Sequence, residues 1–421
     1  MNLAVIGSGG REHALCYKLK KSSKINRLFC IPGNAGTQKI AENIKEDISN
    51  FESIYNVIKK NNIDLVVVGP EQPLVDGLVD YLFEKKIRVF GPDKFSSQLE
   101  GSKAFMKNLC KKNNIPTANF GIFDNFNNAS NFINKNRLPI VVKADGLAAG
   151  KGVFICSSVD EAIKNTKEIL EGKFKSSNKV VLEEFLEGEE LSYFVLTDKN
   201  SYIFFGSAQD HKRVGEGDTG ANTGGMGAYS PAPILTEKLE KKIRKKIIEP
   251  TLKAMQELDH PYRGILYAGL MVKDNEPYLI EYNVRMGDPE CQVLMMRLKT
   301  DLFEIIDLAT QDKIKNLKIE WSTNNAITIV LCARGYPKDY IKDSEIKNLS
   351  NILMNEDNQI FHAGTYEKEN RIFSNGGRVL NITSSANNLI KAREKSLSTI
   401  KKINWFDGFF RRDIGWRVIK K

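Results

Sequence analysis

Hydrophobic and polar residues alternate in blocks along the first hundred residues of the chain. Short apolar runs such as LAVIG and RLFCI are separated by stretches whose apolar positions recur at helical spacing. Continuous apolar strands between amphipathic helices predict a parallel sheet that helices cover on both faces. We expect strands over 3–7, 27–31, 63–70 and 87–92, with helices over 11–21, 51–62 and 73–86 between them.

Beyond residue 100 the pattern changes to strands that are joined by glycine-rich turns. A helix over 102–114 leads to two strands around the turn at 144–152, then to a helix over 158–172 and a strand over 179–185. Further strands follow, with a long glycine-rich loop over 211–233. The run EKLEKKIRKKII keeps Leu239, Ile243 and Ile247 at helical spacing and predicts an amphipathic helix with a basic outer face.

Length and composition narrow the class of protein. A chain of 421 residues favours roughly three domains, and 41% hydrophobic with 27% charged residues is typical of a soluble globular protein. No apolar run is long enough to span a membrane, and we expect no membrane partner. The six cysteines form no CxxC pattern, and the N-terminus lacks the features of a signal peptide. Reduced thiols and a cytoplasmic location are therefore expected.

The formal net charge of +10 raises the question of nucleic-acid binding. The lysines are spread along the whole chain and are not interleaved with exposed aromatic residues on one surface. We therefore expect no nucleic-acid partner. A basic balance also suits a protein that handles several phosphates.

The first strand ends in the turn GSGGRE, which resembles a dinucleotide-binding fingerprint. That fingerprint needs glycine at its sixth position, where this chain has Glu12. It also needs an acidic residue after the second strand, which here runs into Pro32-Gly33-Asn34. A NAD-dependent oxidoreductase is thereby disfavoured. Two interpretations remain: a tight turn without a ligand, or a phosphate or carboxylate site at Arg11 and the helix start.

A second glycine-rich stretch, KADGLAAGKGV, resembles a P-loop but differs from it at two positions. Asp145 stands where the first glycine is needed, and Gly152 replaces the magnesium-binding Ser or Thr. The stretch also leads into a strand, whereas a P-loop opens a helix. A mobile hairpin that folds over phosphates fits better, with Lys143 on the preceding strand as a fixed positive charge.

Three further stretches fit a nucleotide site. In VVLEEFLEGEELSY, the segment from Glu183 to Leu186 could offer main-chain groups to an adenine edge, and Glu190 a carboxylate to ribose hydroxyls. Taken alone, this stretch also fits a charged surface turn. Lys103 lies early in a predicted helix, where a cation opposes the helix dipole unless an anion is near.

The stretch YLIEYNVR alternates strictly, which predicts Leu279, Glu281, Asn283 and Arg285 on one face of a strand. A carboxylate beside an amide supplies hard oxygen ligands for magnesium, and Arg285 could neutralise a transferring phosphoryl group. An edge strand with a wet polar face remains the alternative.

These stretches resemble those of the phosphoribosylamine–glycine ligase family, which has the ATP-grasp fold. The resemblance runs in order over essentially the whole chain. It is carried by the stretches VIGSGGREHA, PGNAG, VGPEQPLVDGL, GPDKFSSQLEGSKAFMK, IVVKADGLAAGKGV, EEFLEGEELS, QDHKRVGEGDTGANTGGMGAYSPAP, YLIEYNVRMGDPE, FHAGT, NGGRVL and RRDIGWR.

The resemblance implies a multidomain α/β and α+β chain. The expected parts are an N-terminal Rossmann-like parallel-sheet domain over 1–102, a connecting helix over 103–120, an ATP-grasp lid subdomain over 121–190, a central subdomain over 191–325, and a small C-terminal domain over 326–421. The implied reaction joins glycine to 5-phosphoribosylamine with ATP, through glycyl phosphate, in purine synthesis. The family also leads us to expect a monomer.

The resemblance further implies roles for individual residues. Lys103 and Lys143 would bind ATP phosphates, and adenosine would be bound by Glu183, Glu184, Phe185, Leu186 and Glu190. Glu281 and Asn283 would hold Mg²⁺ or Mn²⁺, and Arg285 and Lys143 would be catalytic. The substrates would be bound by Gly9, Gly10, Arg11, Asn34, Asp210, Lys212 and Arg285. We assign the phosphate of 5-phosphoribosylamine to the first glycine turn and Arg11.

Two features stay open at this point. The candidates for holding the glycine carboxylate are Arg285 and the segment around Asp210 and Lys212. The lid that must exclude water from an acyl phosphate could be the 144–152 turn or the loop GEGDTGANTGG. The nearest alternative function is another ATP-grasp carboxylate–amine ligase that uses a different acid or amine.

Overall fold

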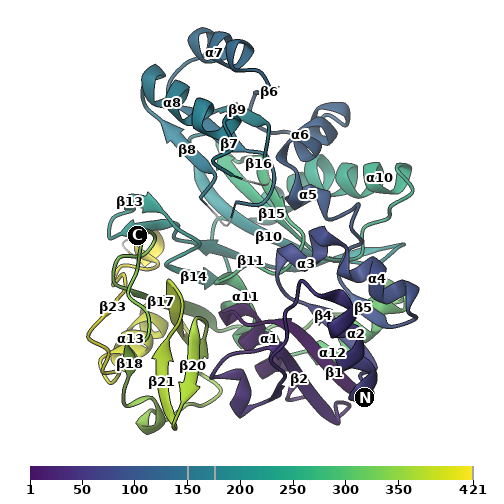
Figure 1. Cartoon of the computed structure of the whole chain (residues 1–421), viewed down its shortest axis with the longest axis vertical. Helices are drawn as coiled ribbons and strands as arrows, with labels where there is room; N and C mark the ends of the chain where they lie inside the picture. The colour runs from purple at the N-terminus through teal and green to yellow at the C-terminus, as the bar shows by residue number, and fades with distance from the viewer. Residues whose placement is uncertain (149–150, 175–176, 420–421) are drawn as a thin grey trace.

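The computed structural model describes residues 1–148, 151–174 and 177–419, and its first part is a parallel sheet covered by helices (Figure 1). The sheet has the strand order β3-β2-β1-β4-β5, and all neighbouring strands run parallel. Alternate residues of β1 belong to different core clusters, Ala4 and Ile6 to one and Leu3 and Val5 to the other. The strand is thus buried on both faces, which confirms the prediction from its continuous apolar run.

The elements of this first part are β1 (Asn2–Gly7), α1 (Gly10–Leu19), β2 (Arg27–Pro32), η1 (Thr37–Lys39), β3 (Glu42–Asn43), α2 (Phe51–Lys60), β4 (Leu65–Val68), α3 (Glu71–Asp76), α4 (Leu78–Glu84), β5 (Arg88–Phe90), α5 (Gln98–Gly101) and α6 (Lys103–Lys112). The single helix expected over 73–86 is instead two, α3 and α4. Gly77 separates them, and its φ of +100° is a left-handed conformation that ends α3.

A small antiparallel sheet of order β6-β9-β7-β8 follows, with α7 and α8 packed on it at the top of Figure 1. Its elements are β6 (Phe120–Phe123), α7 (Phe126–Lys135), β7 (Ile140–Ala144), β8 (Val153–Cys156), α8 (Val159–Leu170) and β9 (Val180–Glu184). The turn that joins β7 to β8 contains residues 149–150, so part of the lid predicted there lies outside the described residues.

The largest sheet is antiparallel and continues without a break from the central part of the chain into its C-terminal part. Its order is β16-β15-β10-β11-β14-β17-β22-β19, with β23 paired to β17. The two halves meet where Gly227–Ser230 of β14 pairs with β17.

The central elements are β10 (Glu189–Thr197), β11 (Tyr202–Asp210), β12 (Arg213–Gly215), β13 (Thr219–Asn222), β14 (Gly227–Ser230), α9 (Glu237–Ile243), the π-helical turn η2 (Arg244–Ile248), α10 (Glu249–Glu257), β15 (Gly264–Lys273), β16 (Glu276–Asn283), α11 (Glu290–Arg297), α12 (Leu302–Thr310) and η3 (Ile314–Asn316). The C-terminal elements are β17 (Asn325–Ala333), β18 (Glu345–Ile346), η4 (Leu349–Asn351), β19 (Asn358–His362), β20 (Thr365–Lys368), β21 (Arg371–Ser374), β22 (Arg378–Ala386), α13 (Leu389–Ile400), β23 (Gly408–Phe409) and α14 (Trp416–Ile419).

Strand β16 departs from the strict alternation that the sequence predicts. Gly269 of β15 pairs with Glu281, but the next residue, Leu270, pairs with Leu279, so Ile280 forms a bulge. As a result Leu279 and Tyr282, three positions apart, both lie in the same hydrophobic core. The prediction that Leu279 shares a face with Glu281 is therefore wrong, because the bulge shifts the phase of the strand.

The glycine-rich loop over 211–233 contains more order than the sequence predicts. Strands β12 and β13 pair as a short hairpin, and β14 then joins the large sheet. The lysine-rich stretch is helical as predicted, as α9 followed by the π-helical turn η2, and it buries Leu239, Ile243 and Ile247. All six cysteines are buried thiols, as predicted, and none of the helices in the described ranges is long and apolar enough to cross a membrane.

Two buried histidines join the first helix to the C-terminal part of the large sheet. The backbone N–H of His362, at the end of β19, donates to Nδ1 of His13 on α1 at 2.8 Å. Burial, with a smaller effect of nearby Lys39, lowers the pKa of His13 to about 3. His13 is therefore neutral in the folded protein at pH values where an unfolded chain protonates it.

This histidine contact predicts a loss of stability in acid. Because the folded pKa lies below the ordinary value near 6.5, His13 stabilises the fold fully above that value, and the contribution falls as the pH drops toward 3. Between pH 6.5 and 5.0 the loss from this group is about 2 kcal/mol. His13→Asn keeps an acceptor for the His362 N–H but does not titrate. We expect its free energy of unfolding to fall by about this much less than that of the unmodified chain when the pH is lowered over the same interval.

The measurement is urea unfolding at pH 7.5 and pH 5.0. His260→Asn, which removes a half-exposed histidine beside Asp93, is the matched control. Equal pH dependence in His13→Asn and the unmodified chain would contradict the assignment.

Candidate functional site

A buried carboxylate holds two lysines at the junction between the small sheet and α6. Glu183 of β9 is 3% exposed, and its two oxygens lie 2.9 Å from Nζ of Lys107 and 2.9 Å from Nζ of Lys143. Lys107, which is fully buried, also donates to Oγ1 of Thr117 at 2.6 Å. The arrangement fixes Lys143 at the end of β7, the position expected for a phosphate-binding cation.

Lys103 lies at the first position of α6, and the structure shows which anion accompanies it. Its ammonium donates to the carbonyl of Gly146 at 3.0 Å. The carboxylate of Asp145 accepts from the backbone N–H of Ala104 at 3.1 Å and from Oγ of Ser102, which caps the helix. An acidic side chain at the helix N-terminus therefore offsets this lysine. The turn that follows β7 supplies both partners.

Glu281 and Asn283 lie near the end of β16, close to several cations. Burial opposes the charge of Glu281, but Lys212, Lys143, Lys103 and Arg285 outweigh it and hold the pKa of this carboxyl below its usual range. Asn283 is 9% exposed. Within the described ranges no three His, Cys, Asp or Glu side chains gather as a metal site. One carboxylate and one amide suit magnesium, which takes few protein ligands and completes its shell with nucleotide phosphates and water.

The segment predicted to bind adenosine joins β9 to β10. The side chain of Glu184 is exposed and accepts from the backbone N–H of Asn119 at 2.9 Å, while Phe185 and Leu186 are half-buried in the connection. On β10, the Glu190 carboxylate lies 2.8 Å from Nζ of Lys212. The side chains of Glu183 and Glu190 thus already have cationic partners, which leaves the main chain of the connection to face an adenine edge.

Asp210 is the last residue of β11, and Lys212 follows two positions later. Both lie beside a cluster of acidic and hydroxyl groups. Burial raises the pKa of Asp210 to about 7. The neighbouring Lys212 opposes this rise, whereas Glu290 and Glu190 add to it. For Lys212 burial acts the other way, but Glu190 and Asp210 outweigh it and raise its pKa. Oε1 of Glu290 accepts from the hydroxyl of Tyr267 at 2.9 Å. The Asp210 carboxyl can therefore accept a cation or change its protonation near neutral pH.

Arg285 is held between two carboxylates of the first part of the chain. Its guanidinium lies 2.7 Å from Glu100 and 3.2 Å from Glu71. Burial raises the pKa of Glu100 to about 7, whereas Arg285 and Arg11 overcome burial and lower the pKa of Glu71 to about 2. This catalytic candidate is therefore rigidly placed and joins β16 to the parallel sheet.

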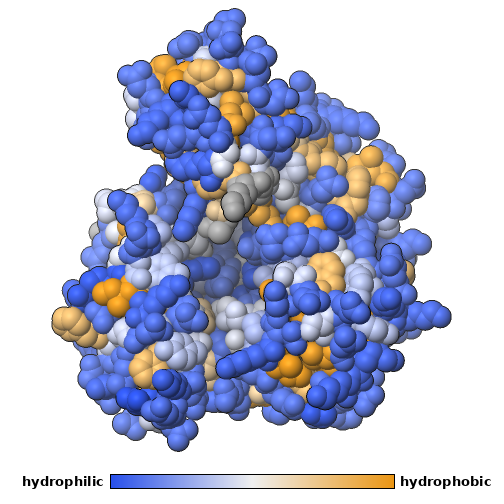
Figure 2. Space-filling model, viewed as in Figure 1, coloured by the Kyte–Doolittle hydropathy of each residue, from blue (hydrophilic) through white to orange (hydrophobic). Residues whose placement is uncertain are grey.

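A polar cavity of about 400 Å³ lies at the N-terminus of α1. Three distant parts of the chain line it: Ser8, Gly9, Pro32, Gly33 and Asn34 from the first sheet, Asp288 after β16, and Ala363, Gly364, Thr365, Asn375 and Arg378 from the C-terminal part. The positive end of the α1 dipole and the Arg378 guanidinium together favour an anion. Figure 2 shows that the molecule is hollowed below the small sheet, with mainly hydrophilic residues around the hollow.

Asn34 shapes this cavity through its side-chain amide. The amide nitrogen donates to the carbonyls of Ser8 and His362 at 2.8 Å each, and the oxygen accepts from the backbone N–H groups of Gly36 and Thr37. The side chain therefore ties the first sheet to β19. Gly9 lies in the cavity wall. Gly10 opens α1, and a Cβ there would lie 2.3 Å from the Asn381 amide.

Arg11 is not among the residues that line the polar cavity. It is 6% exposed, and its guanidinium contacts Glu12 at 2.6 Å and the carbonyl of Met286 at 3.2 Å. Glu12, in turn, accepts from the backbone N–H of Gly9 at 2.6 Å. A Cβ at Gly7 would lie 2.6 Å from the Glu12 side chain, so this carboxylate fills the space beside the glycine turn. Glu12 has a structural role at the position that distinguishes the turn from a dinucleotide fingerprint.

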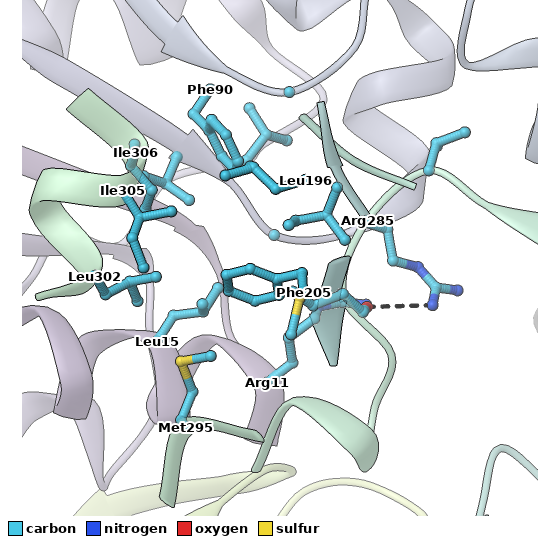
Figure 3. Close-up of a pocket in the computed structure, with 17 residues that line it drawn as sticks. Arg11, Leu15, Phe90, Leu196, Phe205, Arg285, Met295, Leu302, Ile305 and Ile306 are labelled. Carbon is cyan, nitrogen blue, oxygen red and sulfur yellow. Dashed lines mark hydrogen bonds between the residues drawn. The ribbon is translucent and has the colours of Figure 1, made fainter. Parts of the chain in front are cut away.

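Arg11 and Arg285 also line a second cavity, whose other walls are mainly apolar (Figure 3). Its lining includes Leu15, Phe90, Phe205 and Ile305, and its volume is only about 30 Å³. Arg11 and Arg285 both donate to the Met286 carbonyl beside it. This space is too small and too apolar for a phosphorylated substrate.

Sequence reasoning from chemistry missed Arg378 and the other C-terminal residues of the polar cavity. Arg378 donates to the carbonyls of Gly224 and Asp288, and its guanidinium lies 3.7 Å from the Asp288 carboxylate. The available signal was Gly376-Gly377-Arg378, a basic residue directly after a glycine pair. Such a pair indicates a turn, and the sequence alone does not show that the arginine after it faces a cavity.

Comparisons with known proteins match this chain along almost its whole length. Three family models match: the phosphoribosylglycinamide synthetase N domain over residues 1–100, its ATP-grasp (A) domain over 101–291, and its C domain over 326–417. A curated relative from Brucella melitensis, named phosphoribosylamine–glycine ligase, is 47% identical over 100% of this chain and 99% of its own length. One from Arabidopsis thaliana, named phosphoribosylamine–glycine ligase, chloroplastic, is 48% identical over 98% of this chain and 79% of its own length.

A solved structure supports the same relationship. The crystal structure of phosphoribosylamine–glycine ligase from Thermotoga maritima superposes with a TM-score of 0.86 at 33% identity, covering 98% of this chain and 100% of that chain. The expected ATP-grasp fold is thereby confirmed.

The Lys107–Glu183–Lys143 contacts lead to a stability prediction. Glu183→Gln leaves two buried ammonium groups without a counter-charge, and we expect the free energy of unfolding to fall by about 3–5 kcal/mol. The additional change Lys107→Met should restore part of this loss, because it removes one of the two unpaired charges. Scanning calorimetry measures the effect, with Glu184→Gln, at an exposed neighbouring position, as the control. A Glu183→Gln variant as stable as the control would show that these lysines do not need the carboxylate.

Proposed function

The chain belongs to the phosphoribosylglycinamide synthetase family, and we propose that it joins glycine to 5-phosphoribosylamine at the expense of ATP, giving glycinamide ribonucleotide, ADP and phosphate. Relatives with this name align with the chain from end to end, and their family models cover its N-terminal, ATP-grasp and C-terminal parts. This agrees with the reaction expected from the sequence.

One observation carries the proposal: the segment from Glu281 to Asp288 borders both candidate sites. Glu281 lies among the lysines of the nucleotide-type site, and Asp288 lies in the wall of the polar cavity. Arg285 stands between them and is fixed by Glu71 and Glu100. A phosphoryl transfer at one end of this segment would therefore occur beside a substrate held at the other end.

On the nucleotide side, Lys103 and Lys143 are proposed to bind the ATP phosphates, and the main chain from Glu183 to Leu186 to bind the adenine edge. Glu190 is the proposed partner of the ribose. Glu281 and Asn283 are oxygen donors of the kind that Mg²⁺ or Mn²⁺ takes, and they are the proposed metal ligands. A bound divalent cation would supply charge neutralisation at the nucleotide phosphates.

The proposed chemistry needs positioning and charge neutralisation rather than a nucleophilic side chain. A glycine carboxylate oxygen attacks the γ-phosphorus of ATP, ADP leaves, and glycyl phosphate forms. The amine of 5-phosphoribosylamine then attacks the acyl carbon, phosphate leaves, and the nitrogen loses a proton. Lys143 and Arg285 are placed to offset the charge on the transferring group. Asp210, Lys212 and Arg285 remain the candidates for holding glycine.

We assign the phosphoribosyl group to the polar cavity. Gly9 places the start of α1 in the wall of this cavity, where the positive end of the helix dipole favours an anion, and Arg378 in the same lining supplies a positive charge. Arg11 would act indirectly, because it contacts Glu12, and Glu12 in turn holds the backbone N–H of Gly9 in the glycine turn. A phosphate monoester with its ribose suits a polar space of about 400 Å³.

Two further expectations stay predictions. The family leads us to expect a monomer, and the location expected from the sequence is the cytoplasm. The Arabidopsis relative differs in this respect, because its name places it in the chloroplast.

The decisive experiment measures ADP release by the purified chain with ATP, magnesium, glycine and 5-phosphoribosylamine generated in situ. Omission of either glycine or the amine should abolish turnover, and product analysis should give glycinamide ribonucleotide. Glu281→Gln serves as the negative control and should lose turnover most strongly at low magnesium. Release of ADP that is indifferent to glycine, or that follows a different acid or amine, would favour another ATP-grasp ligase instead.

Arg378→Ala tests the assignment of the polar cavity. Loss of one charge-assisted hydrogen bond should raise the KM for 5-phosphoribosylamine by roughly 10- to 100-fold while the KM for ATP stays nearly constant. Arg371→Ala, at an exposed arginine paired with Glu369 in the same part of the chain, is the matched control. If Arg11→Ala raised this KM and Arg378→Ala did not, the phosphate would belong to Arg11.

A further inference from the structure

The glycine-rich hairpin after β11 is held by the C-terminal segment, which we define as residues 411–417. The hairpin comprises β12, β13 and the turn between them, residues 213–222. It directly follows Asp210 and Lys212, two of the residues proposed to bind glycine. The sequence suggested that this loop is a mobile lid, but the structure shows a network of charged contacts that tie it down.

Asp218, in the turn of the hairpin, is the centre of this network. Its carboxylate lies 2.9 Å from Arg411 and 2.7 Å from Arg417, and it accepts from the indole Nε1 of Trp416 at 3.1 Å. The carboxylate oxygen that accepts from Arg411 also lies 3.4 Å from Nδ1 of His211. Burial opposes the charge, yet hydrogen bonds from His211 and Arg411 hold the pKa of Asp218 well below its usual range.

His211 transmits this contact to the site. Its Nε2 accepts from the backbone N–H of Gly415 at 2.9 Å, so its proton lies on Nδ1 and faces Asp218. The backbone of His211 pairs with Gly227 and Met226 at the base of the hairpin. Because His211 stands between Asp210 and Lys212 in sequence, holding its ring and its backbone restrains the stretch of main chain from which both neighbours project.

Further contacts connect the two segments along their length. The backbone N–H of Gly217 donates to Asp413 at 2.8 Å, the backbone N–H of Arg412 donates to Glu216 at 3.1 Å, and Arg411 donates to the carbonyl of Arg213 at 2.9 Å. At the base of the hairpin, Arg378 donates to the carbonyl of Gly224 at 2.7 Å. The C-terminal part of the chain thus holds the hairpin at both ends.

Burial separates this arrangement from ordinary surface packing. Arg411 is 1% exposed and His211 is 1% exposed. Buried charges are costly unless they are paired, and a hairpin that served only as surface could be held by apolar contacts at lower cost. Here Arg411 and Arg417 contact the two oxygens of the Asp218 carboxylate and fix the orientation of a segment that enters the proposed site.

We propose that the C-terminal segment is a positioning element of the active site: by holding Asp218 it fixes His211, and thereby sets Asp210 and Lys212 to receive glycine. The inference rests on the proposed function and adds residues that touch no substrate. Asp218, His211 and Arg411 are positioning residues in this scheme, and Asp210 and Lys212 are the groups they position.

The test is steady-state kinetics of Asp218→Asn and Arg417→Met, with Asp357→Asn as the matched control. Asp357 lies in the C-terminal part and contacts Lys395 and Ser385 rather than the hairpin. We expect Asp218→Asn to raise the KM for glycine about tenfold or more, because one charged hydrogen-bond network is lost, while the KM for ATP and for the amine changes less than threefold. Hydrogen exchange of residues 211–222 should accelerate in the same variant, and Arg417→Lys should retain most of the wild-type glycine KM.

Three outcomes would decide against the inference or its premise. Faster exchange in the hairpin with an unchanged glycine KM would show that the network holds surface structure only. Equal loss in every kinetic parameter, together with a lower melting temperature, would show a general folding effect; half-exposed Arg417 then provides the milder variant in which the same comparison is repeated. Absence of glycine-dependent turnover in the unmodified chain would refute the proposed function instead.

Discussion

Buried charge must be paired, and this constraint organises the junction of the three sheets. Arg285 enters from β16 and is neutralised by Glu71 and Glu100, which belong to helices of the parallel sheet. Glu183 compensates two lysines in the same way at the small sheet. The Arg285 contacts join the end of β16 to helices of the parallel sheet, and the Lys107–Glu183 contact joins α6 to the small sheet. The pairing that places these candidate cations therefore also ties separate parts of the fold together.

The general architecture could be predicted from the sequence, since it depends on local patterns. Continuous apolar strands between amphipathic helices identified the parallel sheet, and the glycine turn was correctly placed before α1. Features that depend on long-range packing could not be predicted. Alternation along β16 fails because Leu279 and Tyr282 both enter one core, which a bulge makes possible. The break between α3 and α4 depends on the left-handed conformation of Gly77, which competes with a strong helical pattern on both sides.

The candidate site shows the same division. Motifs with a chemical rationale pointed to Lys103, Lys143, Glu281 and Asn283, because a carboxylate, an amide and lysines at fixed positions suggest a nucleotide. They could not reveal that Glu183 and Glu190 are engaged by lysines through their side chains. Nor could they place Arg378 in the same cavity as Gly9, since those residues lie 369 positions apart and come together only when the C-terminal part of the large sheet packs against α1.

The cavity at the start of α1 is assembled from segments at opposite ends of the chain, and this has a consequence for biosynthesis. Synthesis from the ribosome is vectorial, so every lysine and carboxylate of the nucleotide-type site emerges before residue 291. The opposite wall of the cavity, from Ala363 to Arg378, emerges only near the end of translation. A nascent chain therefore carries every residue proposed for the nucleotide side well before it has the enclosed space to which we assign the phosphorylated amine.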